Sequence, residues 1–132
     1  MKKASVIIIL IAVVIITVIL LKGPSDIHIA SEDTVTLITL PSPPKFKTVN
    51  NEEDIAPLIN YINSLDTTPV ISTGKGWWFM IKINDYSVIN FVGDVMKING
   101  MSYKVKDKNY ASTIKGMYEN LDYPEDDWVN KK

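Results

Sequence analysis

An uncharged run of 18 residues, from Ala4 to Leu21, restricts this chain more than any other feature. As a helix the run is about 27 Å long at about 1.5 Å per residue, close to the hydrocarbon thickness of a bilayer, about 30 Å. Lys2 and Lys3 precede it and Lys22 follows it, so their ammonium groups can reach the two membrane surfaces. The pattern predicts a transmembrane helix.

Two fates are open for this segment. A cleaved signal peptide usually has an apolar region of about 7–15 residues, followed by a cleavage site of small residues. The one candidate site, Gly23-Pro24-Ser25, contains a proline that makes it poor. We therefore expect an uncleaved signal-anchor, with a cleaved signal peptide as the alternative. Since more lysines precede the run than follow it, the positive-inside rule predicts a single-pass protein of the cell membrane, with its N-terminus in the cytoplasm and its domain outside.

The rest of the chain is acidic and has no cysteine. Three of the 14 lysines flank the apolar run, which leaves 11 lysines against 15 acidic residues, and arginine is absent. Nucleic-acid binding needs a basic surface, so we expect no nucleic-acid partner. Without cysteine there can be no disulfide, thiolate metal site or lipid-modified cysteine. A lone histidine, His28, is weak ground for a metal site or catalysis, and we expect no enzyme activity, metal or cofactor.

Alternating apolar residues predict two strands before the first helix of the outer part. One covers residues 26–31 and the other residues 34–40, and the prolines of "PSPPKFK" then predict an extended connector. The stripe in "NNEEDIAPLINYINSL" predicts a helix. Asp54 is the expected N-cap because a proline at position 57 is tolerated best in the first turn, with Asn50 or Asn51 as alternatives.

Four further strands and a helix follow in the pattern. The strands are expected at 77–83, 86–92, 95–98 and 101–106, with Asn99-Gly100 as a type I′ hairpin turn between the last two. Helical spacing then predicts a helix over 109–121. The order β-β-α-β-β-β-β-α predicts an α+β fold, an antiparallel sheet with two helices packed on one face. The expected organisation is a stub at 1–3, the transmembrane helix at 4–21, a linker at 22–25, the domain at 26–121 and a polar tail at 122–132.

Trp77 and Trp78 form the most suggestive pair for binding. Strand alternation sends one ring to the core and the other outward, and parity with the apolar residues that follow assigns Trp77 to the core. Trp78 is then expected to face outward as a possible partner contact, because an exposed aromatic residue can be a binding hot spot. The alternative is that the outward ring is covered by the tail, against Trp128.

Three quoted segments carry a resemblance: "MKK" with its apolar run, "EEDIAPLINYINSL" and the hairpin "VMKINGMSYKV" before the last helix. The chain resembles small membrane-anchored or lipoprotein-type extracytoplasmic domains of uncharacterised function from low-GC Gram-positive bacteria. The resemblance implies a cell-surface setting and supplies no catalytic residues. It differs from the lipoprotein type because the chain has no cysteine to carry a lipid.

Two functions remain open from the sequence. The first is a membrane-tethered binding or accessory module that acts on a protein partner close to the outer membrane surface. The alternative is a sensing or inhibitory domain that binds a small molecule or a cell-wall fragment on the sheet face opposite the helices. Residues 4–21 predict one partner, the lipid bilayer of the membrane.

Overall fold

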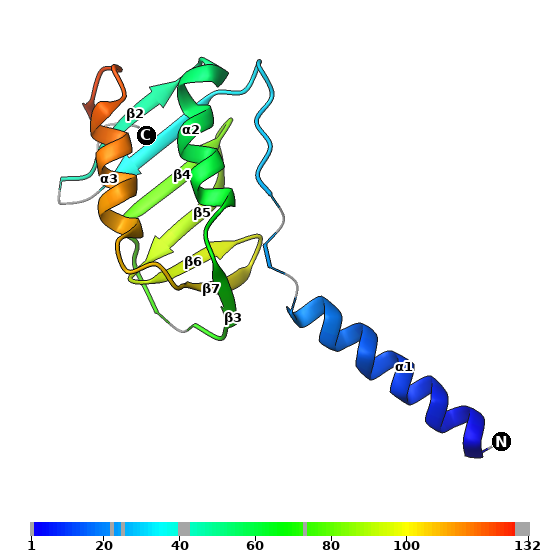
Figure 1. Cartoon of the computed structure of the whole chain (residues 1–132). Helices are drawn as coiled ribbons and strands as arrows, with labels where there is room; N and C mark the ends of the chain where they lie inside the picture. The colour runs from blue at the N-terminus through cyan, green and yellow to red at the C-terminus, as the bar shows by residue number, and fades with distance from the viewer. Residues whose placement is uncertain (1, 22, 25, 40–42, 73, 129–132) are drawn as a thin grey trace.

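The computed structural model describes residues 2–21, 23–24, 26–39, 43–72 and 74–128 (Figure 1). Its helices are α1 (Lys2–Leu21), α2 (Glu52–Asn63) and α3 (Tyr110–Asn120). Its strands are β1 (Val35–Thr39), β2 (Lys45–Val49), β3 (Thr67–Val70), β4 (Phe79–Ile83), β5 (Tyr86–Val92), β6 (Val95–Ile98), β7 (Met101–Val105) and β8 (Asp126–Asp127).

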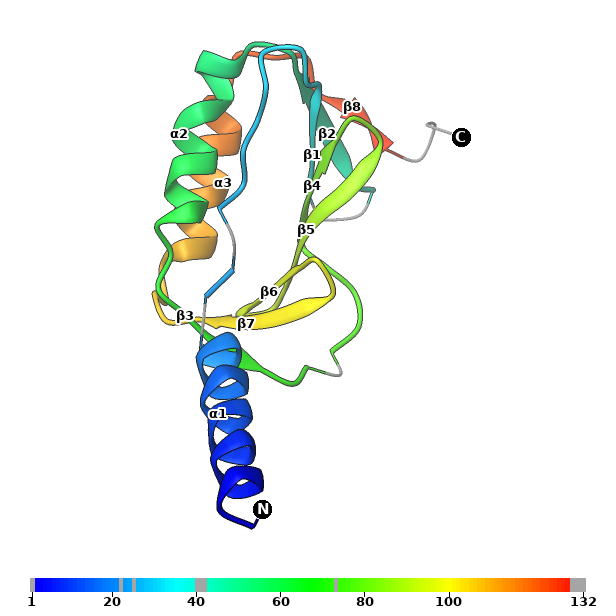
Figure 2. The same cartoon turned by 90° about the vertical axis from the view of Figure 1, so that its right-hand side faces the viewer.

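The strands of the described residues form one antiparallel sheet in the order β3-β7-β6-β5-β4-β1-β2-β8. The sheet curls, and α2 and α3 both cover the same face of it (Figure 2). The predicted α+β class and the packing of two helices on one face are therefore confirmed, and the predicted order broadly matches. The predicted turn is confirmed too, since Asn99 and Gly100 both have positive φ and join β6 to β7.

The core lies between the helices and the sheet. From α2 it takes the stripe that the sequence predicts, and from α3 it takes three side chains one turn apart. The buried members are Ile55, Leu58, Ile59 and Ile62 of α2 and Tyr110, Ile114 and Tyr118 of α3. Strand alternation supplies the other side, with Phe79, Ile81, Ile89 and Phe91 almost fully buried. These contacts hold the whole outer part as one packed unit.

The strand expected at 26–31 is absent, and residues 26–30 are extended without sheet pairing. The reason is a side chain on α2. The Ile27 N–H donates to Asn63 Oδ1 (2.9 Å), and Asn63 Nδ2 donates to the Ile27 carbonyl (3.0 Å). The Asn63 amide thus satisfies the N–H and the carbonyl of Ile27, which a neighbouring strand would otherwise pair with. The segment runs beside α2 (Figure 1). The Ile27 side chain is buried.

Helix α2 begins earlier than expected. Its N-cap is Asn51, one of the two alternatives, and not Asp54. Asn51 Oδ1 accepts a hydrogen bond from the Glu53 N–H at 3.0 Å. This N–H is in the first turn of the helix, where no carbonyl of the helix can accept it. Pro57 therefore lies inside the helix, on its exposed side, where water can solvate the carbonyl that lacks an N–H partner.

Strands β2 and β3 were not expected, because each contains a residue that disfavours a strand. In β2, Lys47 occupies a position that faces the helices, where an apolar residue is the rule, and it is buried. In β3, Pro69 cannot donate to a sheet, and β3 is accordingly an edge strand. The connector expected at "KFK" is thus sheet, and so is the segment 67–70 after α2, for which no strand was expected.

The C-terminal segment is packed on the domain at least as far as Trp128. Strand β8 pairs with β2, and the Trp128 N–H donates to the Pro44 carbonyl (2.8 Å). The Trp128 ring stands edge-on against Phe46, with centroids 5.5 Å apart, on the sheet face away from the helices. Residues up to Trp128, which were expected in a polar tail, therefore pack on the domain, while residues 129–132 lie outside the described residues.

Helix α1 projects from the domain and is apolar and long enough to cross a membrane. The side chains of Lys2–Ile19 are exposed, with none of this membrane-length stretch buried against the rest of the protein. Its C-terminal end lies beside β3 (Figures 1 and 2). The β3 edge of the sheet is thus the part of the domain nearest to the apolar helix.

Candidate functional site

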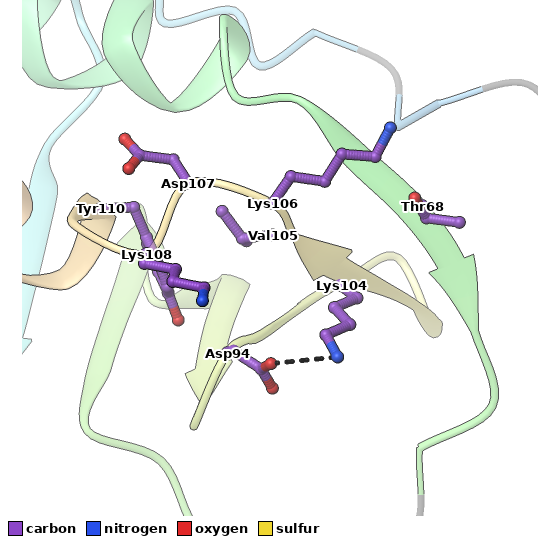
Figure 3. Close-up of a pocket in the computed structure, with 8 residues that line it drawn as sticks. All are labelled: Thr68, Asp94, Lys104, Val105, Lys106, Asp107, Lys108 and Tyr110. Carbon is purple, nitrogen blue, oxygen red and sulfur yellow. Dashed lines mark ion pairs between the residues drawn. The ribbon is translucent and has the colours of Figure 1, made fainter.

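A hollow of about 400 Å³ opens at the β3–β7 edge of the sheet (Figure 3). We call it the lysine recess, and its lining residues are Thr68, Asp94, Lys104, Val105, Lys106, Asp107, Lys108 and Tyr110. They come from β3, the β5–β6 turn, β7 and the segment that leads into α3. The recess is within the volume range of small-molecule sites, about 300–1,000 Å³.

Three lysines and two aspartates, Asp94 and Asp107, are the charged residues that line the recess. Lys104 Nζ lies 3.6 Å from Asp94 Oδ2, and Lys106 Nζ lies 3.5 Å from Asp66 Oδ2. Both pairs are well exposed, so each contributes little stability, about 0–1 kcal/mol, and can open for another anion. Lys108 forms no ion pair with any residue that the structure describes. The recess therefore presents at least one uncommitted ammonium group beside two that are loosely held.

The inner wall of the recess is Tyr110, which the backbone of the β5–β6 turn holds in place. Its hydroxyl donates to the Gly93 carbonyl, and the Trp78 indole Nε1 donates to the same oxygen at 3.0 Å. Gly93 has a φ of +59°, a conformation that glycine adopts readily. Burial raises the pKa of the Tyr110 phenol, so the group stays protonated at neutral pH.

The structure contradicts the expected orientation of Trp78. Its ring packs on the core, with centroid distances of 5.9 Å to Phe79, 5.5 Å to Phe91 and 5.8 Å to Tyr110. The physical reason is that β4 begins only at Phe79, so strand alternation does not reach back to Trp78. Trp77, expected in the core, is only partly buried. Trp128 covers Phe46 and not either of these rings.

Trp78 therefore supports the site rather than forming its surface. It touches Tyr110 from behind and shares the Gly93 carbonyl with it. The sequence analysis overlooked the lysines, although their signal is visible in "KVKDK" at 104–108, where every second residue is a lysine. Without the β3 edge beside them, these residues resemble an ordinary solvated strand face.

The other residues considered for chemistry do not come together. His28 is exposed and lies beside a second, smaller hollow of about 180 Å³ against α2, with Glu52 the one acidic residue in its lining. Over the part of the chain that the structure describes, no three His, Asp or Glu side chains gather closely enough to hold a metal ion. The lysine recess is suited to binding an anionic group by charge and hydrogen bonding.

No family model matches the chain, and no curated protein or solved structure matches it either.

Proposed function

We propose that this protein is a membrane-tethered binding module. In this account α1 spans the cell membrane with the N-terminus in the cytoplasm, and the α+β domain lies outside, against the membrane surface. The domain engages a protein partner there through the lysine recess. The observation that carries the proposal is the position of the recess, on the sheet edge that α1 approaches.

The charge of the domain supports a local and specific contact. Outside the apolar segment the chain has more acidic residues than lysines, so its overall field repels an acidic partner. Lys104, Lys106 and Lys108 line the recess together with Asp94 and Asp107, so its lining has one more basic than acidic side chain, the opposite balance to the rest of the domain. An acidic side chain or C-terminal carboxylate on a membrane-associated protein would complement these lysines, and such complementarity sets the orientation of binding.

A photo-crosslinking residue at position 68 tests the proposal in membranes that contain the full chain. Thr68 is exposed and lines the recess, so it can carry the probe without disturbing the core. We expect one discrete adduct, and we expect Lys108→Glu to reduce its yield at least several-fold. Lys82→Glu makes the same charge change on β4, outside the lining of the recess, and should leave the yield unchanged. An adduct equally strong in both variants, or no adduct, would count against the recess.

The size of the recess favours a second candidate, a small anionic ligand. A hollow of about 400 Å³ with lysines on its rim and a protonated phenol in its wall fits a phosphate or carboxylate group. Titration of the full chain in nanodiscs with inorganic phosphate distinguishes the two candidates. A saturable change in the NMR signal of Tyr110 that Lys108→Gln abolishes would favour the small ligand. No change at phosphate concentrations up to tens of millimolar would favour the protein partner.

A further inference from the structure

Two large apolar side chains are exposed side by side at the end of β3. Ile71, the first residue after β3, is 99% exposed, and Met101, the first residue of β7, is 47% exposed. The register of the two strands ends with Val70 opposite Ser102, so the next position brings Ile71 opposite Met101. We call this pair the apolar corner. Scattered single apolar residues are normal on a surface, but here two coincide on one sheet edge.

The apolar corner is held close to the end of α1. In both views the end of β3 lies beside the C-terminal end of α1 (Figures 1 and 2). The connection is also short, because Ile27 is fixed to α2 by both hydrogen bonds to Asn63. The five residue steps from position 22 to Ile27 can span at most about 17 Å. The domain therefore cannot move far from the surface in which α1 would be embedded.

One carbonyl of the segment that follows the corner is hydrogen-bonded to β6. Lys97 Nζ on β6 donates to the Gly74 carbonyl at 2.8 Å. Lys75, next in the loop, is exposed and close in sequence to Ile71. A lysine beside an exposed apolar pair is the arrangement that suits a membrane interface, where acyl chains meet anionic headgroups.

We infer that the apolar corner inserts into the interface of the same bilayer that α1 spans, and so fixes the orientation of the domain on the membrane. This inference rests on the proposed membrane tether. The occupant is lipid and not a protein, because the corner lies beside the end of the apolar helix and the connection from position 22 to Ile27 is short. With Ile71 and Met101 in the lipid, the lysine recess on the same edge opens along the membrane surface.

Single-cysteine labelling of the full chain tests the inference cleanly, since the natural chain has no cysteine. The variants are Ile71→Cys, Tyr86→Cys and Ala12→Cys, each carrying the same environment-sensitive fluorophore. The protein is reconstituted in vesicles of phosphatidylcholine and phosphatidylglycerol with spin-labelled lipids as quenchers. Tyr86 is the matched control, because it is 79% exposed and lies on the β4–β5 hairpin, away from α1 (Figure 1).

We expect strong quenching of the position 71 label by lipids that carry the spin label near the headgroup, at least threefold above that of the position 86 label. The position 12 label should be quenched by lipids labelled deep in the acyl chain. Met101→Cys should behave like position 71, and adding Ile71→Asp to it should reduce its quenching. Equal, weak quenching at positions 71 and 86 with a deeply quenched position 12 would overturn the inference and leave the tether standing. A position 12 label that stays in water would overturn the tether, and the inference with it.

Discussion

At the scale of single residues, Trp78 shows how one side chain connects the core to the surface site. It packs on Phe79, Phe91 and Tyr110, and its indole N–H shares the Gly93 carbonyl with the Tyr110 hydroxyl. Lys115 Nζ lies 5.6 Å from the centre of its ring on the outer side. The residue that the sequence analysis assigned to a partner is thus a structural support for the wall of the recess.

Trp78→Ala is therefore expected to destabilise the fold by about 3–5 kcal/mol, the range for removing a large aromatic side chain from a core. Trp77→Ala should cost clearly less, because Trp77 is not among the residues packed against this core. Chemical denaturation of the full chain in detergent, followed by tyrosine and tryptophan fluorescence, measures both. A larger loss for Trp77→Ala would show that the two rings have the opposite roles.

Tyr118 should make the free energy of unfolding depend on pH in the alkaline range. Burial raises the pKa of its phenol, and the hydrogen bond to Glu125 Oε2 (2.8 Å) adds to the effect. In the unfolded chain the phenol ionises near its usual pKa, about 10. The stability contribution is thus complete below pH 10 and is lost as the pH rises toward the higher folded-state pKa. Above pH 10 the free energy of unfolding should fall more steeply for the natural chain than for Tyr118→Phe, and identical slopes would contradict this.

At the scale of elements, β2 and α3 are joined by a buried lysine. Lys47 Nζ donates to the carbonyls of Tyr118 (2.9 Å) and Leu121 (2.8 Å), which belong to the end of α3, and the residue is only 7% exposed. The two carbonyls also accept the backbone N–H groups of Leu121 (3.2 Å) and Tyr123 (2.9 Å), so the ammonium group adds a charged second donor at the negative end of the helix dipole. A neighbouring strand thus supplies the C-terminal cap of the last helix.

Lys47→Met keeps the length of the side chain and removes these bonds. We expect a loss of about 1.5–3 kcal/mol in the free energy of unfolding, the usual size for hydrogen bonds to a charged group. Lys104→Met is the matched control and should lose less than about 1 kcal/mol, since its ion pair with Asp94 is exposed. Equal effects of the two substitutions in denaturant titrations would rule out the capping role.

The helices and strands whose apolar residues recur at a regular spacing were predictable from the sequence. The strands that were missed each have a local cause. The stripe on α2, the hairpin at Asn99-Gly100 and the last helix follow from spacing and turn chemistry alone. Strand β2 was missed because the buried Lys47 breaks its apolar pattern, and β3 because Pro69 suits only an edge. The lysine recess could not be predicted, because it depends on β3 and β7 being neighbours.

At the scale of the whole molecule, the chain consists of two parts, an apolar helix and a folded domain. Helix α1 is exposed over Lys2–Ile19 and apolar enough to cross a membrane, while α2, α3 and the sheet form a domain with its own core. The short connection and the bonds from Asn63 to Ile27 keep that domain beside the end of α1. Both the lysine recess and the apolar corner lie on this near edge, so the proposed contacts are all at the membrane surface.

The central proposal, an anchored domain outside the cytoplasm, is tested most directly by labelling intact cells that express the full chain. Because the chain has no cysteine, Tyr86→Cys and Lys3→Cys each create a single reactive thiol. With a maleimide that cannot cross membranes, we predict that position 86 is labelled in intact cells and that position 3 is labelled only after the membrane is permeabilised. Labelling of position 3 in intact cells, with position 86 protected until permeabilisation, would contradict the proposal.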